Sequence, residues 1–372
     1  MIERLYVHNF RCLENFTLDF GGQRSAVLIG KNGAGKTTVV NSLRVFQSIS
    51  RGPNHVKHVI GATDFTRYDK SRPMRFEIDV ALGGARFKYS VSFEWPAEFY
   101  QARIAEESLF KDGVEVFSRK HSQVQLAGRT AFGLDWHVFA LPVINEMPPE
   151  RSIKDIKVFF ANMYLLEPIP SKAGGFSEKP ETEMEREAWN FASCLRALLQ
   201  SKPKAYGIFE SYLKNVMPDF SSIEFEDRGK DGGSQLTVSF EQSQLSLSLS
   251  FDALSAGEKC LMLSAYIMAA NSVRSADDAS IVCVWDEPDN HIALSEVGHL
   301  TTDMRKMAYQ NGQFIATTHH PETIRKFADE NTFVLTRKSH FDPSVVKPLS
   351  AYDYSGDLIH ALIRGEIIDE QG

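Results

Sequence analysis

Several features that mark membrane, secreted and metal-binding proteins are missing from this sequence. Its 372 residues include only 4 cysteines, and no two of them form a CxxC pair, which argues against a zinc knuckle or a disulfide framework. No apolar run approaches the length of a membrane span, and the opening MIERLYVHNF does not resemble a signal peptide. We therefore expect a cytoplasmic protein whose cysteines are buried free thiols: Cys12, Cys194, Cys260 and Cys283.

An excess of basic residues is missing as well. The chain has 41 Lys and Arg against 48 Asp and Glu, a formal net charge of −7, which does not indicate a nucleic-acid-binding protein. Residues 44–75 are an exception, with only Asp64 and Asp69 as acidic side chains. We interpret this stretch as either a solvated loop or a DNA contact. Its basic residues are Arg44, Arg51, Lys57, Arg67, Lys70, Arg72 and Arg75.

Apolar periodicity divides the chain into strands and helices. Alternation with period two predicts strands at 2–8 and 16–20, a meander at 75–126 and a hairpin at 234–251. Short apolar runs predict buried strands in SAVLIG, ASIVCVWDEPD, GQFIATTHHPE and NTFVLTRK. Helices are expected at 36–48, 150–163, 183–201, 204–216 and from LSAGEK to about 272. The predicted fold class is α/β, with a mostly parallel sheet flanked by helices, an antiparallel β subdomain and a helical insertion.

The segment GKNGAGKT, residues 30–37, fits the pattern of a phosphate-binding loop between a strand and a helix. Glycines let backbone N–H groups turn toward phosphate oxygens, and the helix dipole adds positive charge there. Lys36 can reach the β- and γ-phosphates, and Thr37 can offer its hydroxyl to Mg²⁺. We predict an ATP site formed by Gly30, Asn32, Gly33, Ala34, Gly35, Lys36, Thr37 and Thr38.

Two later strands are expected to deliver polar residues to the same kind of sheet edge. Asp286 and Glu287 follow the strand SIVCVW, where Asp286 would face the metal and Glu287 would align a water for attack on the γ-phosphate. His319 follows the strand FIATT and could sense or stabilise the terminal phosphate. Alternatively, these are a solvated acidic turn and an ordinary histidine at a strand end, and we assign His320 a structural role.

The segment LSAGEK, residues 254–259, begins a predicted helix. Ser255 and Glu258 match a capping box, which explains both by local structure alone. A capping box does not explain Gly257, because glycine in a first helical turn costs about 0.5–1 kcal/mol relative to alanine. We therefore predict that another chemical group approaches the backbone at Gly257.

These four motifs, in this order, make the sequence resemble ABC-type ATPases, and the opening IERLYVHNFRCLENFTLDF is similar to their RecF/SMC/OLD-like branch. The resemblance implies ATP and Mg²⁺ as ligands and a homodimer that encloses two ATP molecules. It identifies Ser255, Gly257 and Glu258 as the signature motif, which contacts the ATP of the other subunit. It also makes Glu287, His319 and Lys36 catalytic, and brings Arg11 and Asn290, beside His291, to the nucleotide or the dimer interface.

The resemblance is incomplete at four points. We find no Q-loop glutamine, no sustained heptads for a long coiled coil, no zinc-hook CxxC and no D-x-D pair of a nuclease in residues 323–372. We expect one ABC head over 1–372, with an N-terminal lobe at 1–50, an antiparallel insertion at 51–170, a helical insertion at 171–220 and a C-terminal lobe at 221–372. The favoured function is an ATPase that switches a separate effector, a nuclease or toxin, in bacterial anti-phage defence. The alternative is a RecF-like repair ATPase that clamps DNA directly; a scaffold that holds ATP without hydrolysis and a transporter subunit fit less well.

Overall fold

A computed structural model describes residues 1–52, 55–126, 129–145, 152–228, 233–274, 280–327, 331–354, 356–364 and 367. The chain divides into two compact units. Unit 1 comprises Met1–Met163 and Phe327–Gly372, and unit 2 comprises Tyr164–Lys326. Each unit is described by itself below.

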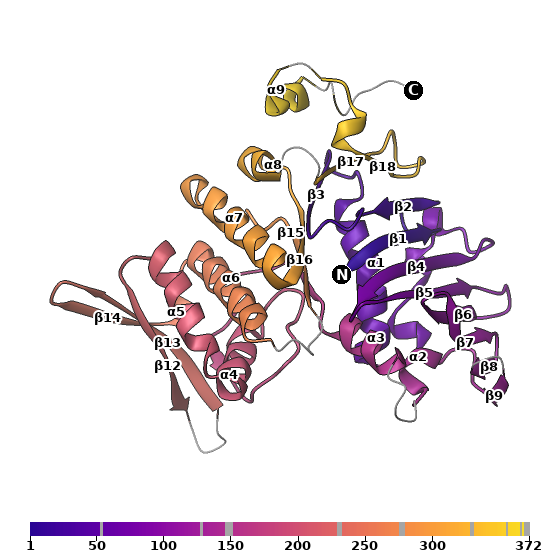
Figure 1. The fold of residues 1–372 in the computed structure, drawn as a ribbon, viewed down its shortest axis with the longest axis horizontal. Coiled ribbons are helices and arrows are strands. Elements are labelled where there is room, and N and C mark those ends of the chain that lie inside the picture. The colour runs from indigo at the N-terminus through magenta and orange to yellow at the C-terminus, as the bar shows by residue number, and fades with distance from the viewer. Residues whose placement is uncertain are drawn as a thin grey trace. The chain divides into compact units, whose positions relative to one another are not determined.

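The larger sheet of unit 1 is antiparallel and has eight strands in the order β2-β1-β4-β5-β6-β7-β8-β9 (Figure 1). It joins the two predicted N-terminal strands to the predicted meander, because β1 pairs with both β2 and β4. The strands are β1 (Ile2–His8), β2 (Phe16–Asp19), β4 (Met74–Leu82), β5 (Ala85–Glu94), β6 (Arg103–Lys111), β7 (Val114–Lys120), β8 (Gln123–Leu126) and β9 (Arg129–Gly133).

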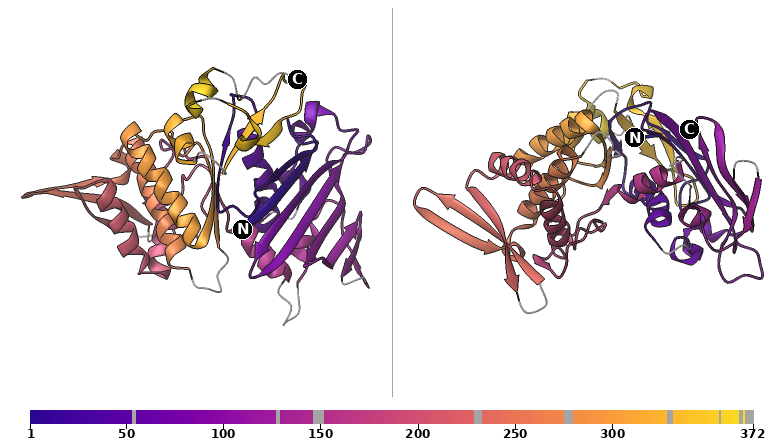
Figure 2. Two further views of the ribbon diagram at one scale, coloured as in Figure 1. Left: turned by 45° about the horizontal axis from the view of Figure 1, so that its top comes forward. Right: turned by 60° about the horizontal axis from the view of Figure 1, so that its bottom comes forward.

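Helices α1 (Lys36–Arg51), α2 (Ala140–Val143) and α3 (Ser152–Ala161) complete this layer. Both views of Figure 2 show α1 and α3 against one face of the broad sheet. Phe46 of α1 lies at the centre of the contact, with its ring 6.0 Å from that of Tyr89 on β5 and 5.4 Å from that of Phe160 on α3. Burial of these large aromatic rings fixes α1, and therefore the loop that precedes it.

A second group of strands in unit 1 contains the strand before the phosphate loop. In it β3 (Ser25–Ile29) runs parallel to β17 (Thr332–Thr336), and β18 (Val345–Pro348) returns antiparallel to β17. All five residues of β3 are buried, as the apolar run predicted. The short helix α9 (Leu358–Ile363) follows.

Unit 2 contains three parallel strands, β10 (Tyr164–Leu166), β15 (Ile281–Asp286) and β16 (Gly312–Thr317), in the order β10-β15-β16. Every residue of β15 and β16 is buried, which is typical of a parallel sheet covered on both faces. Its helices are α4 (Phe191–Ser201), α5 (Ala205–Val216), α6 (Ala256–Ser272), α7 (Leu294–Asn311) and α8 (Pro321–Phe327).

An antiparallel sheet forms the other side of unit 2. It consists of β11 (Phe176–Ser177), β12 (Phe220–Arg228), β13 (Gly233–Gln242) and β14 (Leu245–Ser250), and β13 pairs with the other three. The hairpin predicted at 234–251 is confirmed as β13 and β14.

The predicted helix at 183–201 is wrong in its first half. The helix α4 begins only at Phe191, because the Asn190 side chain bonds the preceding backbone instead of continuing a helix. It accepts from Glu185 N at 3.0 Å and donates to Glu183 O at 2.9 Å. Such local side-chain bonds compete with helical ones.

All four cysteines are buried and free, as predicted. Among the described residues, no helix has both the length and the apolar character required to cross a membrane.

Candidate functional site

The phosphate loop of unit 1 joins β3 to α1 and has the backbone geometry of an anion site. Gly35 caps α1 in the left-handed conformation, with φ 107°, where a side chain would be strained. The first turn of α1 contains no acidic residue, and its N-cap is a glycine, which has no side chain that could cap the N-terminal N–H groups. These N–H groups and the helix dipole therefore fit a phosphate.

Lys36 and Thr37 lie at the start of α1, where the sequence predicted them. The Lys36 side chain is folded back across the loop, and Nζ donates to Gly30 O at 2.8 Å. Thr37 is exposed. Asn32 and Gly33 are exposed, while Ala34 packs into the protein at 3% exposure.

The phosphate loop is also bonded by a segment near the C-terminal end of the chain, far outside the motif in sequence. Ser344 Oγ donates to Ala34 O at 2.7 Å, and Ser344 N donates to Cys12 O at 2.8 Å. A Cβ on Gly35 would lie 2.6 Å from Ser344 Oγ and 3.0 Å from Cys12 Sγ. Glycine is therefore required at 35 by space as well as by φ, and sequence analysis missed Ser344 entirely.

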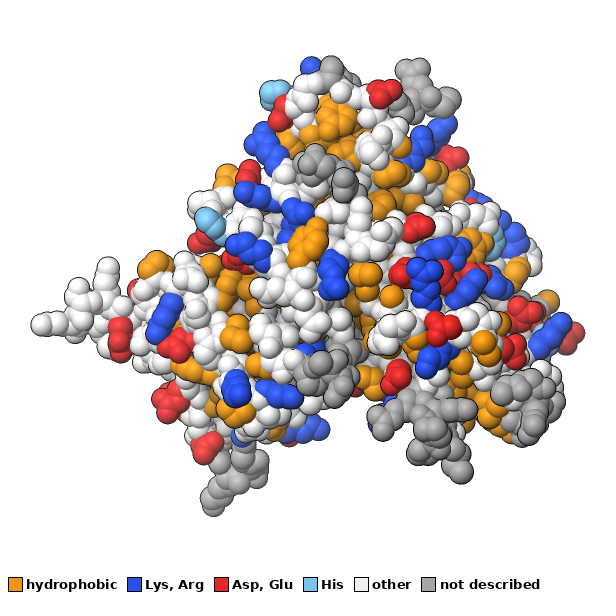
Figure 3. Space-filling view, in the orientation of Figure 1, with side chains coloured by type: hydrophobic (Ala, Val, Ile, Leu, Met, Phe, Trp, Pro, Cys, Tyr) orange, Lys and Arg blue, Asp and Glu red, His pale blue; other side chains and the backbone are white. Residues whose placement is uncertain are grey.

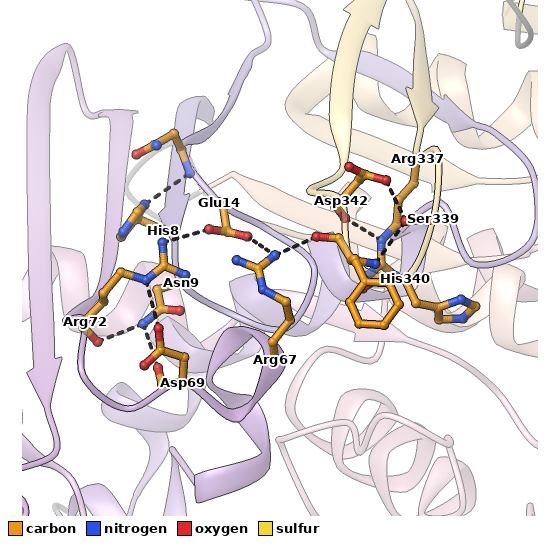
Figure 4. Close-up of polar contacts among 12 residues, drawn as sticks. His8, Asn9, Glu14, Arg67, Asp69, Arg72, Arg337, Ser339, His340 and Asp342 are labelled. Atoms are coloured by element: carbon orange, nitrogen blue, oxygen red, sulfur yellow. Dashed lines mark hydrogen bonds and ion pairs between the residues drawn. The ribbon is translucent and has the colours of Figure 1, made fainter.

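A ring of polar contacts fixes the segment that carries Ser344 (Figure 4). Glu14 accepts from Arg67 at 2.7 Å and from Arg72 at 2.9 Å, and Arg67 also donates to Phe341 O at 2.7 Å. Arg337 donates hydrogen bonds to two backbone carbonyls within the segment that carries Ser344. We name residues 12–14, 67–72 and 337–344 the P-loop clasp.

Arg11, which the resemblance brings to the nucleotide, lies beside the clasp. Its Nε donates to Asp64 Oδ1 at 3.0 Å, and its guanidinium covers the ring of Phe10 at 5.2 Å. Its backbone is left-handed, with φ 52°, and Arg11 N donates to Asp64 O at 2.7 Å. The side chain remains 44% exposed, so it could turn toward a ligand.

The polar residues predicted at two strand ends lie in unit 2, at the carboxyl ends of β15 and β16. Asp286 ends β15 at 6% exposure and accepts a hydrogen bond from Thr317 Oγ1 at the end of β16. Glu287 follows, with Oε1 at 3.1 Å from His319 Nδ1 and Oε2 accepting from Asn290 Nδ2 at 2.7 Å. The structure therefore brings Asp286, Glu287, Asn290 and His319 together, and we call this group the acidic hub.

The backbone of Glu287 is strained in a way that is common at functional sites. Its φ is 54°, a left-handed value that costs free energy for a residue with a side chain. Two hydrogen bonds compensate, because Glu287 N donates to Thr317 O at 3.0 Å and to Thr317 Oγ1 at 3.1 Å. This turn directs the Glu287 carboxylate toward His319.

A third carboxylate, Asp289, supports the hub from within the protein. It is 7% exposed and accepts hydrogen bonds from the hydroxyls of Thr318 and Thr323, the latter at 2.6 Å. His320 bonds residues of its own turn, where N donates to Thr318 Oγ1 and Nδ1 accepts from Glu322 N. That geometry agrees with a structural role for His320, and the role of Asp289 was missed.

The signature segment begins α6 as the sequence predicted. Ser255 Oγ accepts from Glu258 N at 3.3 Å, and Ser255 N donates to Glu258 Oε2 at 2.7 Å, which confirms the capping box. A Cβ on Gly257 would lie 2.9 Å from His291 O. The group that approaches Gly257 is therefore a carbonyl of the same unit, so this glycine does not by itself indicate a nucleotide from another subunit.

Four of the seven basic residues in the stretch 44–75 have an acidic or aromatic partner in the described part of the chain. Arg67 and Arg72 pair with Glu14, Lys70 covers the ring of Trp95 at 4.1 Å, and Arg75 pairs with Glu77 at 2.8 Å. Figure 3 shows basic and acidic side chains intermingled over β1, β4 and β5. Glu77 lies within this group, and burial alone would raise its pKa, but bonds from Arg75 and Lys88 lower it overall.

No cluster of three or more His, Cys, Asp or Glu side chains that could hold a metal occurs among the described residues. Mg²⁺ does not require one, because it is bound by one or two carboxylates together with water and substrate phosphates. Asp286 supplies such a carboxylate in unit 2.

The fold is that of the ABC-type ATPase heads of Smc proteins. Residues 25–325 match the family described as "AAA domain, putative AbiEii toxin, Type IV TA system", and the chain belongs to that family. No curated protein shows significant sequence similarity to it.

Solved structures show the same fold at low sequence identity. One is an Smc head bound to the C-terminal winged-helix domain of ScpA, with TM-score 0.58, 15% identity and coverage of 94% of this chain and 97% of that chain. Another is an Smc head with an extended coiled coil bound to the C-terminal domain of ScpA, from Pyrococcus furiosus, with TM-score 0.53, 14% identity and the same two coverages, 94% and 97%.

Proposed function

We propose that the protein binds ATP with Mg²⁺ and hydrolyses it to ADP and phosphate. The observation that carries this proposal is the acidic hub, in which a strained Glu287 is oriented by both Asn290 and His319. A phosphate loop alone would support binding only. A positioned carboxylate beside a metal-binding aspartate supplies what hydrolysis needs in addition.

The residues divide the chemistry between them. Lys36 and the N–H groups at the start of α1 bind the β- and γ-phosphates, and Asp286 with Thr37 would hold Mg²⁺, which neutralises phosphate charge when bound. Glu287 accepts the proton of the attacking water, and Asn290 keeps one of its oxygens in place. His319 donates a hydrogen bond where negative charge develops.

Two subunits would share two ATP molecules across a two-fold interface. The start of α6, with Ser255, Gly257 and Glu258, serves the nucleotide of the other subunit, since its helix N-terminus attracts an anion. The capping box keeps this N-terminus well ordered, and His291 places it beside the turn that carries Asn290. Hydrolysis removes the γ-phosphate and loosens the dimer.

The ATP switch would act on a separate effector in anti-phage defence. The family description names a toxin of a toxin–antitoxin system, and the solved relatives are heads bound by another protein, ScpA. Direct DNA clamping is less well supported, because three of the arginines that suggested it, Arg67, Arg72 and Arg75, are engaged by Glu14 and Glu77.

The substitution Glu287→Gln tests the proposal. It removes the base but keeps size and hydrogen bonding, so ATP turnover should fall by about 10²-fold or more while ATP still binds. With ATP, the variant should accumulate as a dimer in sedimentation experiments. The matched control is Glu98→Gln, at an exposed carboxylate in unit 1, which should behave as the unsubstituted protein.

Complementation tests whether the sites are shared. Ser255→Arg blocks the start of α6, and Lys36→Ala blocks the phosphate loop, so each variant alone should be inactive. A mixture should regain part of the turnover, because some dimers combine the intact loop of one subunit with the intact α6 of the other. Activity that stays at background in the mixture contradicts shared sites but leaves ATP binding by one subunit intact.

A further inference from the structure

The strand β14 is the most exposed strand of unit 2. Within the described residues it pairs with β13 alone, and its sequence is LSLSLS. Leu245 is 76% exposed and Leu247 is 55% exposed. Figures 1 and 2 show the β13–β14 hairpin projecting beyond the helices of the unit.

The leucines and serines of β14 lie on opposite faces. Leu247 is opposite Phe240 and Leu249 is opposite Val238, so the leucines continue the apolar face of β13, on which Val238 is fully buried. On the other face, Ser248 Oγ lies 2.8 Å from Ser239 Oγ. The apolar face of this sheet, which is buried at β13, is therefore exposed to solvent along β14.

An edge of this kind is normally protected. Natural sheets place a charged side chain, a proline or a bulge on exposed edge strands, because unpaired N–H and C=O groups recruit other strands. None of these occurs in β14, which has no charged residue and no proline. Its register with β13 is also continuous, whereas the β12–β13 register shifts between Phe220 and Ser222.

We propose that β14 pairs antiparallel with β14 of a second copy of this chain. Side chains directly opposite in a sheet share a face. A two-fold axis at Leu247 places it opposite the partner's Leu247, Leu245 opposite the partner's Leu249, and Ser246 opposite the partner's Ser248. Every leucine then meets a leucine, Ser246 and Ser248 meet each other, and only Ser250 lies beyond the paired stretch, opposite residue 244, so residues 245–249 are their own complement. The six uncharged residues carry no like-charge pair that would oppose this register.

The interface does not involve the ATP site. It goes beyond the proposed function, and it exists without nucleotide because β14 contains no phosphate-binding residue. If ATP also joins subunits, two different two-fold interfaces act on one chain, and ATP converts β14 dimers into tetramers or longer assemblies.

The first experiment measures the mass of the nucleotide-free protein by sedimentation over a range of concentrations. We expect a concentration-dependent dimer, and the same dimer for Lys36→Ala. Leu247→Lys places two ammonium groups opposite each other at the axis and should abolish the dimer, as should Leu247→Glu. Mixing the two variants should restore a dimer, because opposite charges then meet. Val114→Lys is the control, at a strand position that is 70% exposed in unit 1, and it should dimerise like the unsubstituted chain.

The second experiment tests the register by mild oxidation. Leu247→Cys should form a disulfide between subunits, since residue 247 faces itself. Ser246→Cys should not, while the double variant Ser246→Cys and Ser248→Cys should. A strictly monomeric nucleotide-free protein, or a dimer that survives both Leu247→Lys and Leu247→Glu, overturns the proposal, and the ATP-dependent tests at Glu287 and Ser255 would be unaffected by that result.

Discussion

The phosphate loop and the acidic hub follow strands in the same way, yet they are held in place by different means. The loop is fixed through its backbone, by Ser344 on Ala34 and by the clasp around Glu14. The hub is fixed through side chains of two short segments, 286–291 and 317–323, that bond one another. The phosphate loop therefore depends on residues outside its own motif, while the hub depends on bonds between the side chains of its own two segments. Substitutions around the phosphate loop should therefore lower ATP affinity, whereas substitutions in the acidic hub should lower stability and turnover.

The largest expected effect is that of Lys36→Ala. It removes the charge of the loop, and each charge-assisted bond to phosphate contributes about 1.5–3 kcal/mol. Calorimetry should detect no ATP binding, although the protein remains folded. Unchanged ATP affinity would show that the loop is not the nucleotide site.

Asp289→Ala should have the second-largest effect, which is a loss of stability. It leaves the hydroxyls of Thr318 and Thr323 buried without their acceptor, and each unsatisfied group costs about 1–3 kcal/mol. Urea unfolding should show a loss of about 3 kcal/mol in the free energy of unfolding. Thr323→Ser keeps the donor and serves as the control; a loss as large as that of Asp289→Ala would contradict the assignment.

Ser344→Ala should have a moderate and selective effect. It removes the hydrogen bond to Ala34 O, worth about 1 kcal/mol, so ATP affinity should fall about fivefold. The exposed Ser350→Ala, six residues further on, is the control. Equal ATP affinity of the two variants would mean that Ser344 does not position the loop.

The smallest effect is expected at Glu14 and depends on pH. Burial alone would raise the pKa of this carboxyl, but hydrogen bonds and charge from Arg67 and Arg72 bring it below the usual 4.5. A lowered folded pKa stabilises the protein above pH 4.5, and this gain is lost as the pH falls through the folded value. Both arginines are more than a third exposed, at 37% and 38%, so solvent screening limits the gain to about 1 kcal/mol.

Chemical unfolding of Glu14→Gln checks this sign. The difference in unfolding free energy from the unsubstituted protein should be constant from pH 6 to 8 and shrink below pH 4.5. A difference that grows on acidification would refute the role of the ion pairs.

Much of the site was predictable because its residues lie where short motifs place them. The glycine and lysine positions of 30–37, the capping box at Ser255 and the strand ends at Asp286 and His319 all follow from local patterns. Ser344 and Asp289 were not predictable, since neither belongs to a motif and each acts through a partner elsewhere in the chain. Asn190 misled the helix prediction because its side-chain bonds do not show in apolar periodicity.

The sequence by itself determined the class of chemistry, because a phosphate loop and a strand-end carboxylate each require particular residues at fixed spacing. Only the tertiary structure decided what holds them. Gly257 shows the difference: the sequence indicated that something approaches its backbone, and the structure identified the carbonyl of His291. Which groups lie close together in the folded protein cannot be read from the spacing of residues along the chain.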